Sequence, residues 1–334
     1  MKAYVLNGID QLDYMDVPLP ETPAGWALIK VKSSGICSSD IPRIFSKGTY
    51  HFPTIPGHEF SGVVHSVADS ENKDWIGKRV CVFPLIPCMK CEQCLSKNYQ
   101  RCKHYDYIGS RRDGAFAEYV SAPVWNLLEL PDTVSFDLGA LVEPLSVALH
   151  SVNRIISKKP KSLAVIGTGL IGVCSGLWAK KLGIEDVTVI GRNDSKKSTV
   201  IDLNLDYSLS VSDKKYDAVI EAVGSNESFK NAVSICKDGG DIVLVGNPEG
   251  EMSLSQKDYW QILRRELSLH GVWNSQFLSG EYCEWKNSVE FLEKSANELN
   301  KLITARYSSD ELKMGLQLMK NKEKPYFKVM IQWE

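Results

Sequence analysis

The hydrophobic pattern divides the chain into a part made of short strands and a part in which strands alternate with helices. In the first part, short apolar runs such as residues 26–31 and 79–83 are separated by proline and glycine. This punctuation is typical of a β-rich domain. In the later part, apolar runs at residues 163–166, 186–190 and 241–246 indicate strands of a parallel sheet. The pattern therefore predicts an α/β fold with a second, β-rich domain.

Three glycines connect the run at residues 163–166 to an apolar helical pattern that continues to Lys181. Their spacing, G-x-G-x-x-G between a strand and a helix, is the one that a dinucleotide-binding turn requires. The first glycine allows a tight turn, the second admits the pyrophosphate to the backbone, and the third lets the helix pack against the strand. The N–H groups at the helix start then face the phosphates. The predicted cofactor-binding residues of this turn are Gly167, Gly169, Leu170, Ile171 and Gly172.

The end of the next strand, residues 186–190, bears on the choice of cofactor. Folds that bind NAD place an acidic residue here, where it holds the ribose 2′-hydroxyl. This chain has Gly191 and Arg192 instead, and a guanidinium can bind the 2′-phosphate of NADP. Lys196 adds a further positive charge. We therefore expect NADP to be preferred over NAD, unless Arg192 is only an exposed surface residue and Asp194 serves the ribose.

Composition and charge exclude several classes of protein. The chain has 334 residues, which is enough for two domains, and 24% of them are charged. A net charge of −2 gives no electrostatic basis for binding nucleic acid. The N-terminus has no apolar signal core, so we expect a cytoplasmic protein. We expect no membrane span either, because glycine, serine and threonine interrupt the apolar stretch at residues 162–179.

Four of the nine cysteines lie close together in the spacing C-x2-C-x2-C-x7-C. Four thiolates on one loop, with no open position, are typical of a structural, tetrahedral zinc site. Two disulfides, an iron–sulfur cluster and a redox-sensing loop are the alternatives, and an intracellular location disfavours the disulfides. The predicted ligands are Cys88, Cys91, Cys94 and Cys102.

Three further segments, residues 34–40, 56–60 and 142–146, resemble those of the zinc-dependent medium-chain dehydrogenase/reductase superfamily. The resemblance extends over nearly the whole chain. It implies a GroES-like, β-rich catalytic domain combined with a Rossmann domain, which is a doubly wound parallel sheet. The expected boundaries are 1–150 for the catalytic domain, 151–285 for the dinucleotide-binding domain and 286–334 for a C-terminal return to the catalytic domain.

The resemblance implies a catalytic zinc held by Cys37, His58 and Glu143, whose thiolate, imidazole and carboxylate leave one coordination position open. Glu59 follows His58 in the sequence and is expected close to the metal, beside the ligands or as an exchanging ligand. Asp40 would orient His58 through the other ring nitrogen. Together with the cysteine loop, this makes two zinc ions per subunit.

The implied reaction is the reversible oxidation of a secondary alcohol, with zinc as a Lewis acid and the nicotinamide as hydride acceptor. Ser39 matches the first hydroxyl of the superfamily's proton relay. The strand end at Val245, Gly246 and Asn247 is expected to line the nicotinamide pocket. We also expect a homo-oligomer, a dimer or tetramer, because relatives build their subunit interface near the last strand, residues 266–273. A non-catalytic NADPH-binding structural protein on the same fold is the alternative from another class.

Residues 41–45, 84–88 and 106–114 are similar to the galactitol-1-phosphate 5-dehydrogenase sub-family. This similarity implies a small-molecule substrate, a sugar-alcohol phosphate that is oxidised to a keto-sugar phosphate. Arginines in these segments can clamp a phosphate through two parallel hydrogen bonds. An unphosphorylated, sorbitol-like polyol or a simple secondary alcohol is the alternative. The candidate substrate residues are Arg43, Tyr50, Arg111 and Arg112, with His51 as a further pocket residue.

Overall fold

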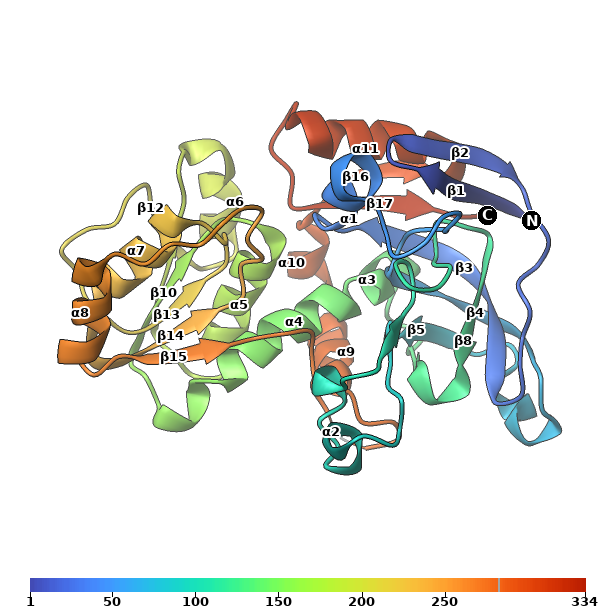
Figure 1. Ribbon diagram of the computed structural model, residues 1–334, viewed down its shortest axis with the longest axis horizontal. Coiled ribbons are helices and arrows are strands. Elements are labelled where there is room, and N and C mark those ends of the chain that lie inside the picture. The colour runs from blue at the N-terminus through green and yellow to red at the C-terminus, as the bar shows by residue number, and fades with distance from the viewer. Residues whose placement is uncertain (282) are drawn as a thin grey trace. The chain divides into compact units, whose positions relative to one another are not determined.

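Two compact units make up the protein. The computed structural model describes residues 1–281 and 283–334. The first unit consists of Met1–Glu143 and Gln276–Glu334, and the second of Pro144–Ser275. Both chain termini therefore belong to the first unit (Figure 1).

Both divisions lie earlier in the chain than residues 150 and 285, where we expected them, and two contacts explain this. The indole N–H of Trp178 donates to the carbonyl oxygen of Leu145 at 2.9 Å, which ties the chain after position 143 to the second unit. The Phe277 ring stacks on Phe83 with the ring centroids 4.9 Å apart. The return to the first unit therefore begins at residue 276.

The first unit is built around a sheet with the strand order β16-β17-β3-β4-β5-β9, and β8 also pairs with β3. β16 and β17 are parallel, and the other pairings described for this sheet are antiparallel. Fully buried side chains such as Ile29, Phe60 and Phe116 form the core of this unit. The sheet strands are β3 (Trp26–Ile36), β4 (Glu59–Val67), β5 (Arg79–Val82), β8 (Tyr119–Pro123), β9 (Leu127–Glu129), β16 (Ile303–Ser308) and β17 (Lys328–Gln332).

Short elements complete the first unit around this sheet. Two small antiparallel pairs join β1 to β2 and β6 to β7. Their bounds are Lys2–Gly8 (β1), Gln11–Asp16 (β2), Leu85–Ile86 (β6) and Asp106–Tyr107 (β7). The helices are α1 (Asp40–Pro42), α2 (Glu92–Leu95), α3 (Phe136–Ala140), α9 (Glu284–Lys294), α10 (Ala296–Asn300) and α11 (Leu312–Asn321).

The helical stretch that carries Glu143 is broken, but not at Pro144. Proline inside a helix usually breaks or kinks it. The break instead falls at Leu141, between α3 and α4 (Val142–Asn153), and Pro144 lies in the first turn of α4. Proline is tolerated there because the first N–H groups of a helix have no intrahelical partner.

The second unit contains a parallel sheet with the strand order β12-β11-β10-β13-β14-β15. The order reverses beside β10, which is the topological switch point of a Rossmann fold. Figure 1 shows helices packed along this sheet. The strands are β10 (Ser162–Ile166), β11 (Asp186–Ile190), β12 (Asp206–Ser208), β13 (Tyr216–Glu221), β14 (Cys236–Leu244) and β15 (Ser268–Gly271), and the helices after α4 are α5 (Leu170–Lys181), α6 (Lys197–Asp202), α7 (Asn226–Ile235) and α8 (Gln256–Arg264). The predicted α/β fold with a β-rich domain is therefore confirmed.

One strand of this sheet starts earlier than the sequence indicated. Gly239 and Gly240 were expected ahead of the strand, but they lie inside β14. Gly239 has a φ of 71°, and the pairing register with β13 shifts in this region, so the two glycines form an irregularity within the strand. Throughout the described part of the chain, the helices are too short or too polar to cross a membrane.

Candidate functional site

Three neighbouring strands of the first unit bring together residues that are far apart in the chain. β4 and β17 pair with the end of β3 from its two sides, so that Gly35 faces Glu59 and Ile36 faces Val329. Cys37 follows β3 directly. A side chain at position 35 would overlap the Glu59 carboxylate, so glycine here leaves room for that carboxylate beside Cys37.

The end of β3 and the start of β4 form a cluster of metal-binding side chains. The thiol of Cys37, a ring nitrogen of His58 and a carboxylate oxygen of Glu59 all lie within 4.8 Å of one another. His58 and Glu59 are buried. Because thiolate, imidazole and carboxylate are the donors that zinc takes in catalytic sites, the residues present fit a zinc ion.

Glu143, which the resemblance implied as the third ligand, is buried near this cluster but is not one of its three members among the described residues. Burial raises the pKa of Glu143 to about 7; His58 lowers this pKa, and the neighbouring Glu59 carboxylate raises it further. Two carboxylates thus face one site, and Glu59 is the one at ligand distance from Cys37 and His58.

Asp40 is fully buried and joins the cluster to its support. One of its oxygens accepts a hydrogen bond from the backbone N–H of Cys37 at 3.0 Å. The other oxygen accepts a hydrogen bond from Nη1 of Arg43 at 2.7 Å and lies 3.5 Å from Nδ1 of His58. Burial acts to raise the pKa of Asp40, but His58 and Arg43 outweigh it and hold this pKa below its usual value. Arg43, expected at the substrate, is therefore bonded to the carboxylate that faces His58.

Lys328 is a member of this site that the sequence analysis missed. It is 3% exposed, it donates to a Glu59 carboxylate oxygen, and it donates to the carbonyl oxygen of Ile36 at 3.0 Å. A buried ammonium is stable only when it is paired and hydrogen-bonded. The indication in the sequence that this lysine is buried was its place within the apolar run 327–331.

Ser39 and Tyr107 lie beside the same cluster. The hydroxyl of Ser39 donates to Sγ of Cys37 at 3.3 Å. The Tyr107 ring meets the His58 ring edge to face, with the centroids 5.8 Å apart. Burial raises the pKa of Tyr107 well above its usual value, and Glu143 raises it further. Tyr107 was not singled out from the sequence, because its only signal was its place in the segment 106–114.

The four cysteines of the predicted loop site converge. Their sulfur atoms lie within 4.8 Å of one another, and the closest described pairs are 3.6 Å (Cys91–Cys94), 3.9 Å (Cys91–Cys102) and 4.0 Å (Cys88–Cys94) apart. A disulfide would need about 2.05 Å. Zinc–sulfur bonds of about 2.3 Å in a tetrahedron place the sulfurs at roughly these separations, so the loop fits zinc and does not contain the alternative disulfides.

The other candidate substrate residues have different partners. Arg112 donates through Nε to Asp106. Arg111 lies with its guanidinium carbon 4.3 Å from the ring centroid of Tyr50 and 4.3 Å from that of Tyr105. His51 contacts the backbone oxygen of Arg111 through Nε2 at 3.1 Å. Tyr50, Tyr105 and Arg111 thus form one stack.

In the second unit, each fingerprint glycine has its own steric reason. Gly167 has a φ of 114°, which other residues rarely adopt. A side chain at Gly169 would meet no atom within 4 Å, so this backbone faces open space, and a side chain at Gly172 would overlap the carbonyl oxygen of Gly167. Leu170 and Ile171 begin α5, and their N–H groups lie at the helix end that favours anions.

The end of β11 carries the residues that bear on the choice of cofactor. A side chain at Gly191 would overlap the Tyr207 hydroxyl, so a carboxylate fits at this position only if the Tyr207 ring moves. Arg192 is exposed. Lys196 donates to the carbonyl oxygen of Thr168, inside the glycine turn, at 3.0 Å, and burial lowers the pKa of Lys196 to about 8.

A cavity of about 310 Å³ lies at the carboxyl ends of β13 and β14, and Glu221, Gly224 and Gly246 are among its lining residues. The backbone N–H groups of Val245 and Gly246 both donate to the carbonyl oxygen of Glu221, at 3.0 and 2.9 Å. Asn247 follows directly. In a Rossmann fold, ligands bind at this edge of the sheet.

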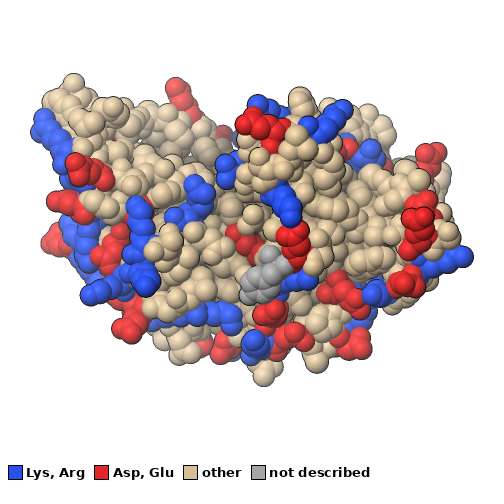
Figure 2. Space-filling model, turned by 90° about the horizontal axis from the view of Figure 1, so that it is seen from below, with Lys and Arg blue, Asp and Glu red and all other residues tan. Residues whose placement is uncertain are grey.

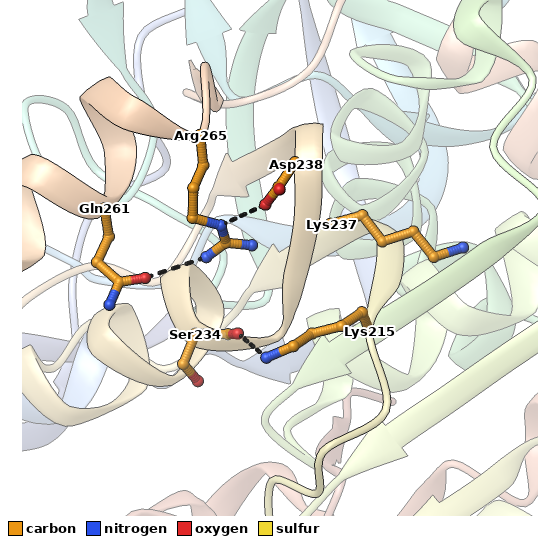
Figure 3. A pocket seen from close by; sticks show the side chains of 6 residues that line it. All are labelled: Lys215, Ser234, Lys237, Asp238, Gln261 and Arg265. Carbon is orange, nitrogen blue, oxygen red and sulfur yellow. Dashed lines mark hydrogen bonds and ion pairs between the residues drawn. The ribbon is translucent and has the colours of Figure 1, made fainter.

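A larger hollow, of about 590 Å³, lies at the opposite edge, where β13 and β14 begin (Figure 3). Its basic residues serve the fold. Arg265 donates to the carboxylate of Asp238 and to the carbonyl oxygens of Val233 and Cys236, at the end of α7, where a cation is stabilising. Across the molecular face in Figure 2, basic and acidic side chains are interspersed, as expected for a net charge of −2.

Comparisons with known proteins agree with this geometry. The family model of the alcohol dehydrogenase GroES-like domain matches residues 23–132, and that of the zinc-binding dehydrogenases matches residues 171–294. Galactitol 1-phosphate 5-dehydrogenase from Escherichia coli (strain K12) is 30% identical, over 86% of this chain and 87% of the relative. L-threonine 3-dehydrogenase from Escherichia coli is 25% identical, over 96% of this chain and 95% of the relative.

Solved structures show the same likeness. The crystal structure of galactitol-1-phosphate dehydrogenase from Escherichia coli matches with a TM-score of 0.88 and 29% identity, and covers 99% of this chain and 100% of that one. A zinc-binding dehydrogenase from Sinorhizobium meliloti 1021, bound to NADP, matches with a TM-score of 0.87 and 26% identity, and covers 99% and 98%. The chain belongs to the zinc-dependent medium-chain dehydrogenase/reductase superfamily, whose enzymes use zinc and NAD(P).

Proposed function

We propose that this protein oxidises a secondary alcohol of a sugar-alcohol phosphate to a keto-sugar phosphate, with galactitol 1-phosphate or a close analogue as its substrate. The cluster of Cys37, His58 and Glu59 is the observation that carries the reaction type. The substrate class is supported by the similarity to galactitol 1-phosphate 5-dehydrogenase, which extends over 86% of the chain.

In this proposal, Cys37, His58 and Glu59 hold a catalytic zinc, and Glu143 is the second carboxylate available to it. Zinc bound there would supply a Lewis acid that makes the substrate hydroxyl more acidic. The thiols of the cysteine loop hold a second, structural zinc, since four like ligands leave no open position. Each subunit thus carries two zinc ions with different tasks.

The surrounding residues position these ligands and move the proton. Asp40 fixes the Cys37 backbone through the 3.0 Å bond and faces His58. Lys328 holds the Glu59 carboxylate by a buried ion pair. Ser39, whose hydroxyl lies 3.3 Å from Sγ of Cys37, would relay the proton that the alcohol loses, accepting it while its own hydroxyl proton passes to solvent.

We further propose that the second unit binds NADP in preference to NAD. The nicotinamide supplies the hydride acceptor, and the strand end at Val245, Gly246 and Asn247 lines its pocket. The preference is supported by Gly191, where a carboxylate would overlap Tyr207, and by the exposed cation of Arg192. A guanidinium can bind the 2′-phosphate, and this position lacks the carboxylate that would repel it.

A homo-oligomer is part of the proposal. β15 is the last strand in the order of the second unit's sheet, and an unpaired strand edge can pair with another chain. Leu269 and Trp273, on and just after β15, are 42% and 56% exposed. Light scattering of the purified protein should give a mass of at least two 37.3 kDa chains, and a monomer would contradict this.

Initial rates on the zinc-loaded protein test the proposed reaction. Galactitol 1-phosphate is compared with galactitol and sorbitol, each with NADP and with NAD. The proposal predicts the highest kcat/KM for the phosphate ester with NADP. Activity on the free polyols alone would contradict the substrate class, and equal or better rates with NAD would contradict the cofactor preference. No oxidation of any of the three would contradict the reaction type.

A further inference from the structure

We propose that Arg111 is the residue that binds an anionic group of the substrate, and that Tyr50 and Tyr105 hold its guanidinium ready for this. The inference rests on the proposed function, because it concerns the same substrate. It selects one arginine from the three that the sequence offered as candidates.

The guanidinium of Arg111 contacts two aromatic rings and two hydrogen-bond acceptors. Its carbon lies 4.3 Å from the ring centroid of Tyr50 and 4.3 Å from that of Tyr105. Nη1 donates to the backbone oxygen of Tyr105 at 3.1 Å, and Nη2 to the hydroxyl of Tyr50 at 3.3 Å. These four contacts hold the guanidinium in place, and its N–H edge is the part that forks onto a phosphate or carboxylate.

Charge distinguishes Arg111 from the other two arginines. Arg43 is paired with Asp40, and Arg112 with Asp106. Among residues 1–281 and 283–334, Arg111 makes no ion pair, and its Nε is buried without a hydrogen-bond partner. A partly dehydrated cation that has no counter-charge gains more from an anion than one already paired.

A row of aromatic contacts connects Arg111 to the metal-binding cluster. The Tyr107 ring centroid lies 5.8 Å from that of His58, and 6.3 Å from that of Tyr105, which in turn covers Arg111. The backbone beside this row is also fixed, because Nε2 of His51 contacts the carbonyl oxygen of Arg111. Successive ring contacts through Tyr107 and Tyr105 therefore link the cation to the proposed reaction centre.

Tyr50 is the member of the stack whose side chain can move aside. Its side chain is 68% exposed, whereas Tyr105 is partly buried. When an anion binds, it replaces the Tyr50 hydroxyl on Nη2 and can also accept from Nε. A phosphate monoester and a carboxylate both present the pair of anionic oxygens that this fork needs, so substrates of both kinds are compared in the test.

The test compares Arg111→Met, Arg111→Lys and a control, Arg154→Met, which removes the same charge from an exposed position in the other unit. Each variant is assayed on galactitol 1-phosphate as the phosphate ester, on L-idonate as the carboxylate and on uncharged galactitol. Thermal unfolding checks that each variant is folded. Arg111→Met should lower kcat/KM for the preferred anionic substrate about 10- to 100-fold, and change the value for galactitol less than about twofold. Arg111→Lys should fall in between, because it keeps the charge and loses the fork.

An equal loss on galactitol, or an unchanged ratio between charged and uncharged substrates, would overturn the assignment. A larger loss on galactitol 1-phosphate than on L-idonate identifies the anion as a phosphate, and the reverse identifies it as a carboxylate.

If the wild type oxidises none of these compounds, the proposed function fails, and binding tests Arg111 separately. Calorimetric titration with inorganic phosphate is then made in an Arg192→Ala background, which removes the proposed 2′-phosphate contact. Adding Arg111→Met should abolish the remaining phosphate binding, whereas adding Arg154→Met should leave it. Equal binding in the two double variants, or none in the Arg192→Ala parent, would overturn the assignment independently of catalysis.

Discussion

The candidate metal site of the first unit and the candidate cofactor site of the second are built in opposite ways. The metal site takes Cys37, Glu59 and Lys328 from three strands, and the pair Lys328–Glu59 joins residues 269 positions apart. The glycine turn lies within one connection, between β10 and α5. The metal site therefore forms only when the first unit is fully folded, whereas the turn follows from local backbone requirements.

The two sites also differ in how they hold charge. Asp40, Glu59 and Lys328 are almost completely buried, and buried charges are tolerated only as partners of one another. Arg192 is exposed, so removing it costs little stability. We conclude that changes in the assembled site should alter stability and activity together, whereas changes in the local cofactor site should alter binding alone.

The largest effect is expected from Cys37→Ser. A serine hydroxyl is a poor zinc ligand at neutral pH, so kcat/KM should fall at least about 10³-fold, which corresponds to about 4 kcal/mol. Metal analysis should show one zinc ion lost and one retained. Cys174→Ala, at a cysteine outside both clusters, is the control and should keep both ions. Full activity in Cys37→Ser would contradict the assembled site.

Cys94→Ser tests a metal site of the first unit whose ligands all lie close together in the chain. Losing one thiolate of the loop should release the second zinc and cost about 4 kcal/mol of stability. The kcat of the protein that remains folded at low temperature should change only a few-fold. If kcat fell as far as in Cys37→Ser while the fold persisted, the loop would not be merely structural.

Lys328→Met should destabilise the zinc-free protein by about 3 kcal/mol, because it leaves the Glu59 carboxylate buried without its partner. Urea unfolding measures this. The double variant Lys328→Met/Glu59→Gln removes both charges and should recover most of the loss. A single variant as stable as the wild type would show that the buried pair does not hold the site together.

Arg192→Ala should raise KM for NADP about 10- to 30-fold and leave KM for NAD within about twofold, because only NADP carries the 2′-phosphate. The melting temperature should stay unchanged. Arg154→Ala, which removes an exposed arginine elsewhere in the second unit, should alter neither KM. A parallel rise in KM for both cofactors would contradict the proposed role of Arg192, since it would indicate a general disturbance of the glycine turn.

The smallest effect concerns pH. Burial lowers the pKa of Lys196 to about 8, so its ammonium is charged below pH 8 and neutral above it. KM for NADP should therefore rise a few-fold between pH 7 and pH 9, and Lys196→Gln should remove this rise. The same shift makes stability increase with pH between about 8 and 10.5, because the unfolded chain then holds the proton more tightly. A flat KM profile for NADP in the wild type would contradict a role for Lys196.

The elements that the sequence predicted well are those defined by neighbours in the chain. The strand, glycines and helix of residues 162–181 were located from spacing alone, because each glycine answers a local steric demand. The four loop cysteines likewise converge as their short spacing indicated. Sequence spacing is informative when the structure that it encodes is itself short.

What the sequence could not predict depends on contacts between distant strands. Lys328 reaches Glu59 only because β17 pairs with β3. The pairing of β3 with β4 likewise brings a carboxylate oxygen of Glu59 within 4.8 Å of the Cys37 thiol. Tyr105 and Tyr107 were also missed, since nothing in the sequence shows that one ring packs against Arg111 and the other against His58. The roles of such residues can be identified only from the folded sheet.

The central claim is that the cluster of Cys37, His58 and Glu59 holds the zinc on which alcohol oxidation depends. Stepwise removal of zinc by a chelator, with bound zinc counted by native mass spectrometry and oxidation of galactitol 1-phosphate with NADP measured on the same samples, tests it most directly. The account predicts that activity disappears with the loss of one zinc ion while the fold persists, and that Cys37→Ser starts with that ion already missing. Undiminished oxidation by the zinc-free protein, or by Cys37→Ser, would contradict it.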